Sequence, residues 1–182
     1  MFYPLLSKLL DYPVDDLFAA LPELHAALAQ GCSAEERHVL EGFLDHLAGM
    51  EPTEAQALYV QTFDLTPQHA LHLTHHLFGD DKNRGPALID LAEFYKEYGL
   101  ELAIGAANDE DGARTAVNEL PDYLPLMLEF ASRLDAEEAR MFLAQWGKVL
   151  GQLAANLEAA GSAYAPLVRL VEARSRLVRA AA

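Results

Sequence analysis

Hydrophobic residues recur along most of this chain at intervals of three and four, the spacing that places them on one face of an α-helix. One such stripe runs from Val39 to Leu47, and a longer one runs from Phe142 to Leu157. No strand-like alternation of useful length appears, and no repeat of the helical-solenoid type is found. The pattern therefore predicts an all-α fold, a single compact domain over residues 1–182 with roughly eight to ten helices.

Capping signals mark where several helices begin. Ser33 and Asp135 are each followed three residues later by Glu, and Thr53 is followed at the same distance by Gln, which is the pattern of a capping box. We therefore expect helices to begin at these three positions. The helix after Asp135 is expected to be the longest, because its hydrophobic stripe continues to about Ala160.

Prolines and glycines punctuate the rest of the chain. Thr66 followed by Pro67 predicts a helix that runs to Phe78 and is closed by Gly79, and Pro86 is expected to open the next helix. Further helices are predicted over residues 1–10, 14–30 and 167–180, and a breaker-rich acidic loop is predicted over 105–112.

The chain carries 13 Lys and Arg against 28 Asp and Glu, which gives a formal net charge of -15 and a pI of about 4.7. Such a surface repels nucleic acid and anionic membranes and attracts basic partners, although solubility alone is the simpler explanation of the charge. The charge is uneven, because residues 162–182 hold four Arg and one Glu. We therefore expect a weakly basic C-terminal helix on an acidic body.

The single cysteine, Cys32, excludes an intramolecular disulfide and a CxxC redox or metal site. The apolar N-terminal segment is too short for a signal peptide and lacks a basic leader. No stretch approaches the length of a membrane-spanning helix. These features predict a cytoplasmic protein.

Four histidines lie close together between residues 69 and 76. If residues 67–78 form one helix, His69, His72 and His76 share a face, and two histidines four residues apart can chelate zinc. A metal site would need a further ligand, for which Asp64 or Asp80 is available. The alternative is that these side chains supply hydrogen-bonding groups to a groove or a partly buried polar face.

Other polar residues in the centre of the chain point to binding and not to catalysis. The Asp80–Asp81 pair lacks the spacing of a calcium loop, and no nucleophile, triad or phosphate loop stands near it. Arg84 precedes a helix, where it can pin the turn through Asp80 or Asp81 or contact the backbone carbonyls of a partner. No catalytic arrangement is legible, so the function must be argued from binding, and no cofactor or metal is expected.

The segment Glu119-Leu-Pro-Asp122-Tyr123 precedes another predicted helix. Asp122 is placed to cap that helix by accepting hydrogen bonds from its free amide groups. Capping does not explain the neighbouring Glu119, Pro121 and Tyr123, so a binding role is favoured for this segment.

Two blocks of this sequence resemble a known family. YVQTFDLTPQHALHLTHHLFGDDKNRGPALIDL and ELPDYLPLMLEF are similar to the NarJ-type chaperones, also called the respiratory nitrate reductase delta subunit. These belong to a wider group of maturation chaperones that includes the TorD and DmsD types. That group carries an acidic-x-Pro-Asp-His signature, and here Glu119, Pro121 and Asp122 match it while Tyr123 stands where His is usual.

The resemblance implies an all-helical cytoplasmic chaperone that is not an enzyme. Its expected partner is the N-terminal segment of the catalytic subunit of respiratory nitrate reductase, held while molybdenum cofactor and an iron–sulfur cluster are inserted, before membrane docking. Substitution of Asp122 or Arg84 is expected to weaken this binding without unfolding the domain. The residues expected to bind the peptide are Tyr59, Phe63, Asp64, His76, Asp80, Arg84, Gly85, Glu119, Pro121, Asp122 and Tyr123.

Three alternatives stay open at the level of the sequence. The same fold could serve another molybdoenzyme, such as an oxide or sulfoxide reductase. The histidines could form the metal site of a helical enzyme, or the chain could be a structural adaptor without peptide preference. The four histidines also suggest the hypothesis that peptide release depends on pH.

Overall fold

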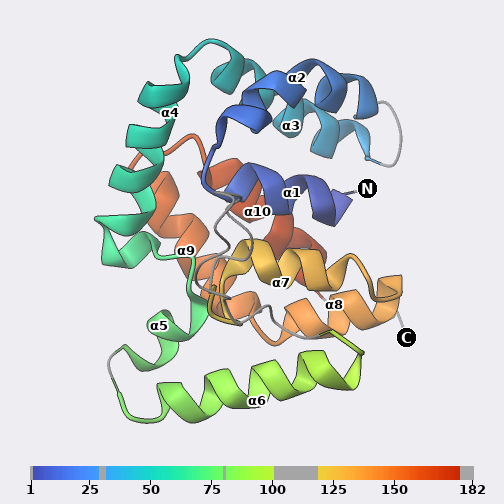
Figure 1. Cartoon of the computed structure of the whole chain (residues 1–182), viewed down its shortest axis with the longest axis vertical. Helices are drawn as coiled ribbons and strands as arrows, with labels where there is room; N and C mark the ends of the chain where they lie inside the picture. The colour runs from blue at the N-terminus through green and yellow to red at the C-terminus, as the bar shows by residue number, and fades with distance from the viewer. Residues whose placement is uncertain (1, 29–31, 80, 101–118, 177–182) are drawn as a thin grey trace, which may run out of the picture.

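The computed structural model describes residues 2–28, 32–79, 81–100 and 119–176, and these ranges confirm the all-α prediction. They contain ten α-helices and no β-strand (Figure 1). The helices are α1 (Phe2–Leu10), α2 (Asp15–Ala27), α3 (Ala34–Ala48), α4 (Pro52–Tyr59), α5 (Leu73–Phe78), α6 (Arg84–Glu97), α7 (Leu124–Ala131), α8 (Ala136–Ala144), α9 (Gly147–Ala159) and α10 (Ala165–Ser175). A π-helical turn, η1 (Val60–Asp64), and a 3-10 turn, η2 (Pro67–His69), lie between α4 and α5.

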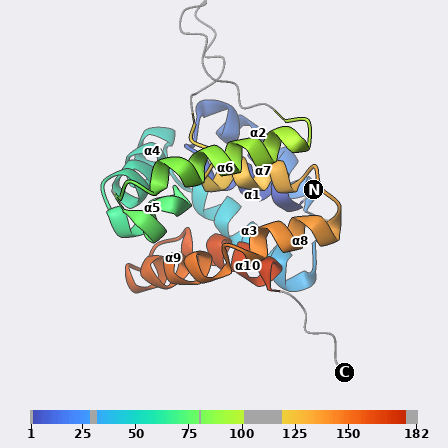
Figure 2. The ribbon, with the colours of Figure 1, turned by 90° about the horizontal axis from the view of Figure 1, so that it is seen from below.

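The helices pack as pairs around one core (Figures 1 and 2). α2 lies against α3, α1 against α7, and both α8 and α9 against α10. α6 runs along the lower edge of Figure 1 and packs mainly against its neighbour α5. Within the described ranges, none of the helices combines the length and apolar content that crossing a bilayer requires.

The contact between α1 and α7 forms the middle of the core. Leu6 of α1 and Leu124 and Leu128 of α7 are all 0% exposed. Burial of such side chains stabilises the fold by roughly 25 cal/mol per Å² of apolar surface. The Ser7 hydroxyl is also buried here and donates to the Pro125 carbonyl at 2.8 Å. This contact fixes the start of α7, and therefore the segment 119–123 that precedes it.

Two of the three predicted capping boxes are confirmed. Ser33 and Asp135 each accept a hydrogen bond from the third amide of their helix, and the Glu at that position returns one. The prediction for Thr53 is wrong, because α4 begins earlier, at Pro52, with Glu51 as its N-cap and no side-chain cap. Proline at the first helical position lacks an N–H and already has a helical φ, so no capping side chain is needed there.

The predicted continuous helix from Pro67 to Phe78 is wrong. The chain makes the short turn η2, becomes extended at 70–72, and only then forms α5. The extended piece forms an antiparallel bridge between His72 and Tyr123, so a long-range pairing overrides the local helical pattern. The predicted stop at Gly79 is confirmed, since its φ of 54° is one that glycine adopts without strain.

The long helix predicted after Asp135 is divided in two. α8 ends at Ala144, and the chain turns at Gln145 and Trp146 before α9 begins at Gly147. The turn lets both helices pack on α10, which one straight helix would not do. α1, α2 and α10 lie where helices were predicted, whereas the predicted loop 105–112 falls outside the described residues.

Candidate functional site

Two segments far apart in the sequence cross at the centre of the molecule. The Leu73 amide donates to the Asp122 carbonyl at 3.0 Å, and the Leu124 amide donates to the Leu71 carbonyl at 2.9 Å. The His72 and Tyr123 rings therefore lie side by side, with centroids 5.2 Å apart. This crossing joins the start of α5 to the start of α7.

Asp122 sits inside the crossing and caps α5. Its side chain is 0% exposed and accepts hydrogen bonds from the Thr74 amide at 2.9 Å and the Thr74 hydroxyl at 2.5 Å. Thr74 lies in the first turn of α5, whose amide groups have no partner within the helix. The prediction that Asp122 caps the helix that follows it is therefore wrong, because α7 has Tyr123 as its N-cap and no side-chain cap.

The Arg84 guanidinium completes this buried cluster. Its Nε donates to the Thr74 hydroxyl at 3.0 Å, and its Nη2 lies 3.9 Å from Asp122. On the other side, Nδ1 of His72 lies 3.4 Å from Oδ1 of Asp122, and neither of these two buried atoms has a hydrogen-bond partner. Arg84 thus pins its turn through Asp122 and Thr74.

Opposing effects act on the Asp122 carboxyl. Burial by itself raises its pKa, but the His72 ring and the hydrogen bonds from Thr74 outweigh burial. The pKa of Asp122 consequently lies below its ordinary value, and the side chain is an anion in the folded protein.

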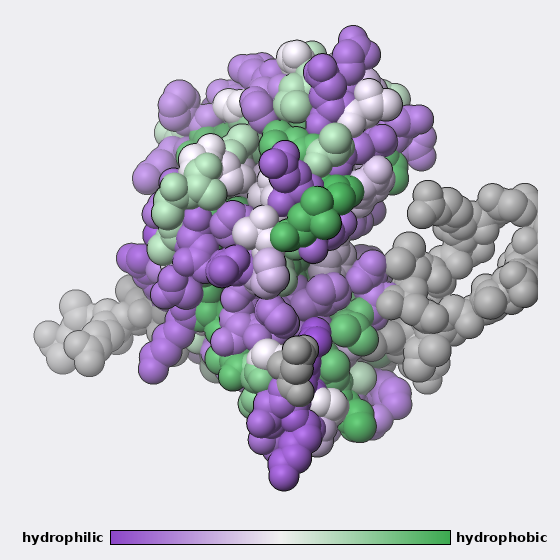
Figure 3. Space-filling view, turned by 90° about the vertical axis from the view of Figure 1, so that its left-hand side faces the viewer, coloured by the Kyte–Doolittle hydropathy of each residue, from purple (hydrophilic) through white to green (hydrophobic). Residues whose placement is uncertain are grey.

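A cleft of about 750 Å³ opens beside the crossing, between the α1–α2 link, η1 and the segments 70–72 and 119–123. We call it the acidic cleft. The described residues that line it include four carboxylates, Asp11, Asp16, Asp64 and Glu119, and no Lys or Arg. Figure 3 shows the side of the molecule that bears α4 and α5, which is mostly hydrophilic with separate groups of hydrophobic side chains. The cleft thus concentrates negative charge in a concave site, where it favours a cation.

Aromatic side chains form the floor of the acidic cleft. Tyr59 and Phe63 are 3% and 4% exposed, and their ring centroids lie 4.8 Å apart. Tyr12 lies at the rim, 39% exposed, and meets the Tyr59 ring edge-on. Apolar parts of a ligand can therefore pack near the same carboxylates that attract its charge.

The π-helical turn η1 helps to shape this floor. The Leu65 amide donates to the Val60 carbonyl at 3.0 Å, five residues back, so the turn is wider than an α-helical turn. It leaves Phe63 buried in the floor and Asp64 exposed at the rim. Such turns are rare and recur at functional sites.

A chain of hydroxyl groups holds one carboxylate of the acidic cleft. The Tyr123 hydroxyl donates to Asp11 at 2.9 Å and lies 2.8 Å from the Tyr59 hydroxyl, which also reaches the Leu10 carbonyl. Burial, and then the neighbouring Tyr59 and Asp11, raise the pKa of Tyr123 far above its ordinary value. The Tyr123 hydroxyl therefore keeps its proton and orients Asp11, a role that phenol fulfils without an imidazole.

Several effects act on the Glu119 carboxyl in the acidic cleft. Burial raises its pKa, and the nearby Asp11 and Asp64 raise it further, although His72 acts in the opposite direction. A bound cation would relieve this repulsion and favour the ionised form of Glu119.

The structure brings together five of the residues predicted to bind a peptide and separates the others. Tyr59, Phe63, Asp64, Glu119 and Tyr123 line the acidic cleft. Asp122 and Pro121 are buried behind it, and His76 and Arg84 are half-buried and support the crossing. Gly85 is exposed on α6, and Asp80 lies outside the described residues.

The sequence interpretation missed the contribution of the α1–α2 link. Asp11, Tyr12 and Val14 of this link line the acidic cleft, together with Asp16 in the first turn of α2. The available signal was an acidic and aromatic pair, Asp11–Tyr12, directly before Pro13, since exposed breaks of this kind often carry binding residues.

The predicted face of three histidines does not form, because residues 67–78 are not one helix. His69 is buried against the Thr62 carbonyl at 3.1 Å, and His76 donates from Nε2 to the Ala70 carbonyl at 2.7 Å. Burial lowers the pKa of His76, which favours its neutral form. No group of three or more potential metal ligands occurs within the described ranges.

The structure thus combines an all-helical fold with a concave, acidic cleft that has an aromatic floor, and no catalytic arrangement is recognised among the described residues. The chain matches the family described as nitrate reductase delta subunit over residues 17–169. Because this match covers most of the sequence, the chain belongs to that family. The resemblance inferred from the two central sequence blocks is thereby confirmed.

Individual relatives agree with the family match. The chain is 34% identical to the nitrate reductase molybdenum cofactor assembly chaperone NarJ of Escherichia coli over 169 aligned residues. This alignment covers 92% of this chain and 66% of that protein. It is 31% identical to the probable nitrate reductase molybdenum cofactor assembly chaperone NarJ of Bacillus subtilis over 166 aligned residues. That alignment covers 91% of this chain and 83% of the relative. The chain thus spans about two thirds of the length of the Escherichia coli relative.

Proposed function

We propose that this protein is an assembly chaperone of a respiratory nitrate reductase, and that its acidic cleft binds the N-terminal segment of the catalytic subunit before that subunit docks at the membrane. The names of the relatives support the chaperone role. The observation that carries the choice of site is the concave arrangement of four carboxylates above an aromatic floor. Cofactor insertion would take place in the bound client, and the chaperone itself supplies no catalytic group.

The chemistry of the acidic cleft favours a basic, amphipathic peptide. Carboxylates at the rim attract Lys and Arg and speed association, while Tyr12 and Val14, 39% and 47% exposed, offer apolar contacts beside them. A helix that lies in a groove uses both kinds of contact at once. Because the peptide must become ordered on binding, part of the interaction free energy is lost and the complex is reversible, as release of a client requires.

Calorimetric titration with the N-terminal peptide of the nitrate reductase catalytic subunit from the same source tests this proposal. We expect saturable one-to-one binding with a negative heat-capacity change, and no binding of a scrambled peptide that keeps the composition. Tighter binding of the corresponding peptide from an oxide or sulfoxide reductase would assign the chaperone to that client. Equal binding of all three peptides would instead support a structural adaptor.

Peptide affinity is expected to rise with pH. The pKa of free Glu119 is raised by burial and by neighbouring carboxylates, so the peptide's positive charge lowers it and binding releases a proton. Linkage then makes the affinity increase as pH rises through the pKa of free Glu119.

Titrations between pH 5 and 8, in two buffers of different ionisation enthalpy, measure this dependence and count the protons. A Glu119→Gln variant should show a flatter profile and release fewer protons, whereas the exposed Glu23→Gln variant should match the parent. Affinity that is the same at both ends of this range would contradict the assignment.

A further inference from the structure

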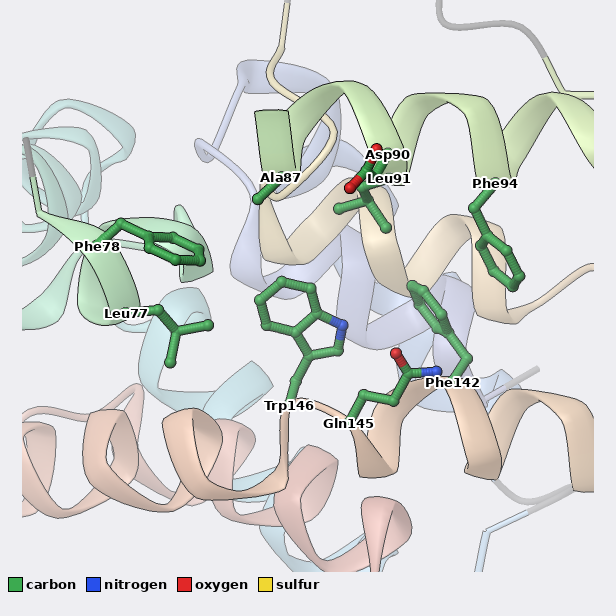
Figure 4. A pocket seen from close by; sticks show the side chains of 9 residues that line it. All are labelled: Leu77, Phe78, Ala87, Asp90, Leu91, Phe94, Phe142, Gln145 and Trp146. Atoms are coloured by element: carbon green, nitrogen blue, oxygen red, sulfur yellow. The ribbon is translucent and has the colours of Figure 1, made fainter. Parts of the chain in front are cut away.

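A second concave surface lies away from the acidic cleft, between α5 and α6 on one wall and α8 with the turn before α9 on the other (Figure 4). We call it the aromatic groove, and its volume is about 410 Å³. The Trp146 ring occupies its centre, with Phe78 towards one end and Phe94 and Phe142 towards the other. None of its lining residues lines the acidic cleft.

The aromatic groove is open along its length, which favours a peptide over a small molecule. Leu77 at one end is 55% exposed, and Asp90 and Gln145 on opposite walls are also exposed. Past Phe94 on α6, the Tyr98 ring contacts the Phe94 ring and is 44% exposed. Small-molecule sites bury most of the ligand surface, roughly 70–90%, and this shape does not allow such burial.

The spacing of the α6 residues that line the groove fits a bound helix. Ala87, Leu91 and Phe94 of α6 face the groove at intervals of four and three residues, so they form one ridge. At a rise of about 1.5 Å per residue, that ridge is roughly 10 Å long and matches about two turns of a docked helix. Helix-in-groove recognition uses anchors at this same spacing.

The charge of the groove indicates that a helix bound there should carry a basic residue. Among the described residues, Asp90 is the only charged one that lines the aromatic groove, and it takes part in no ion pair with another of them. A Lys or Arg on the occupant would meet Asp90 on a protein whose net charge is -15. A second copy of this chain would bring the same net charge of -15 to the groove, and its helix α10 has Arg169, Arg174 and Arg176 already paired with the chain's own glutamates, so like-charge repulsion disfavours it as the occupant.

We propose that the aromatic groove is a second interaction surface, which binds an amphipathic helix of a partner protein. Two or three apolar side chains of that helix would pack on Trp146 and Phe94, and one Lys or Arg would pair with Asp90. The proposal does not rest on peptide binding by the acidic cleft, and either can fail without the other.

Trp146 is the only tryptophan of the chain, so its fluorescence reports on this groove alone. The probe is a synthetic helical peptide of about three turns, with Leu at intervals of three and four and one Arg beside the Leu face. A second peptide carries Glu in place of that Arg. We expect a saturable blue shift with the Arg peptide and binding about tenfold weaker with the Glu peptide.

An Asp90→Lys variant should reverse this preference, because the attractive and repulsive pairs exchange places. Glu97→Lys, which makes the same change at an exposed position of α6 outside the groove, should leave the preference unchanged, and so should Asp64→Lys in the acidic cleft.

Three results would overturn the proposal: no spectral change with either peptide, a preference insensitive to Asp90→Lys, or a preference abolished by Asp64→Lys. A self-association that the Arg peptide fails to displace, seen by sedimentation, would assign the groove to a second copy and would also overturn it.

Discussion

Replacing Asp122 by alanine is expected to lower the free energy of unfolding by about 3–5 kcal/mol. The carboxylate is fully buried, and its loss leaves the Thr74 amide without its acceptor and the Arg84 guanidinium without a nearby anion. The sequence suggested that substitution of Asp122 would weaken binding without unfolding the domain. The structure changes that expectation, because Asp122 holds α5 and α6 to the segment before α7.

Thermal and urea unfolding measure the effect. A chain of this length loses roughly 2–4 °C of melting temperature per kcal/mol, so a decrease of about 10 °C is expected. Asp122→Asn keeps one acceptor for the Thr74 amide and should lose about half as much, and Asp90→Ala, at an exposed aspartate, should match the parent. An Asp122→Ala variant as stable as the parent would show that the cluster contributes nothing net to folding.

The same variants predict a difference in acid stability. The folded-state pKa of Asp122 lies below its unfolded value, so its contribution is fully present above the unfolded pKa and is lost as pH falls through the folded pKa. The parent should therefore lose stability on acidification more steeply than Asp122→Asn, which has no carboxyl to protonate at this position.

Removing two charges from the acidic cleft, with Asp64→Asn and Glu119→Gln together, is expected to weaken binding of the client peptide about 30-fold. Each partly exposed carboxylate contributes roughly 1 kcal/mol to a cationic partner, and about 2 kcal/mol corresponds to that ratio of dissociation constants. Most of the remaining affinity would come from apolar contacts with the rim and floor. The loss should shrink at high salt, because screening weakens the parent's charge contacts as well.

Calorimetry at two salt concentrations measures this loss. The matched control is Glu23→Gln with Glu97→Gln, which removes the same charge from exposed positions outside both cavities. Equal weakening in the control would attribute the effect to net charge and not to the acidic cleft. Undiminished binding by the double variant, with a normal melting temperature, would place the peptide elsewhere.

The local sequence determined those helices whose start is fixed by residues of their own first turn. The capping boxes at Ser33 and Asp135 form because each satisfies amide groups within its own first turn. The hydrophobic stripes placed the core residues, since burial of one helical face requires that periodicity. The same central blocks sufficed to recognise the family and to name five of the residues that line the acidic cleft.

Only the tertiary structure decided how the central segment is used. His69, His72 and His76 were expected to share one helical face, yet residues 70–72 are extended because their backbone pairs with the segment before α7. Asp122 was expected to cap the helix that follows it, but it accepts instead from the Thr74 amide of α5, which is far away in the sequence. Likewise Asp11 and Tyr12 join Glu119 and Tyr123 only when α1 packs on α7. Hydrogen bonds and charges between distant segments depend on which surfaces the core brings together, and hydrophobic periodicity within one helix does not encode that choice.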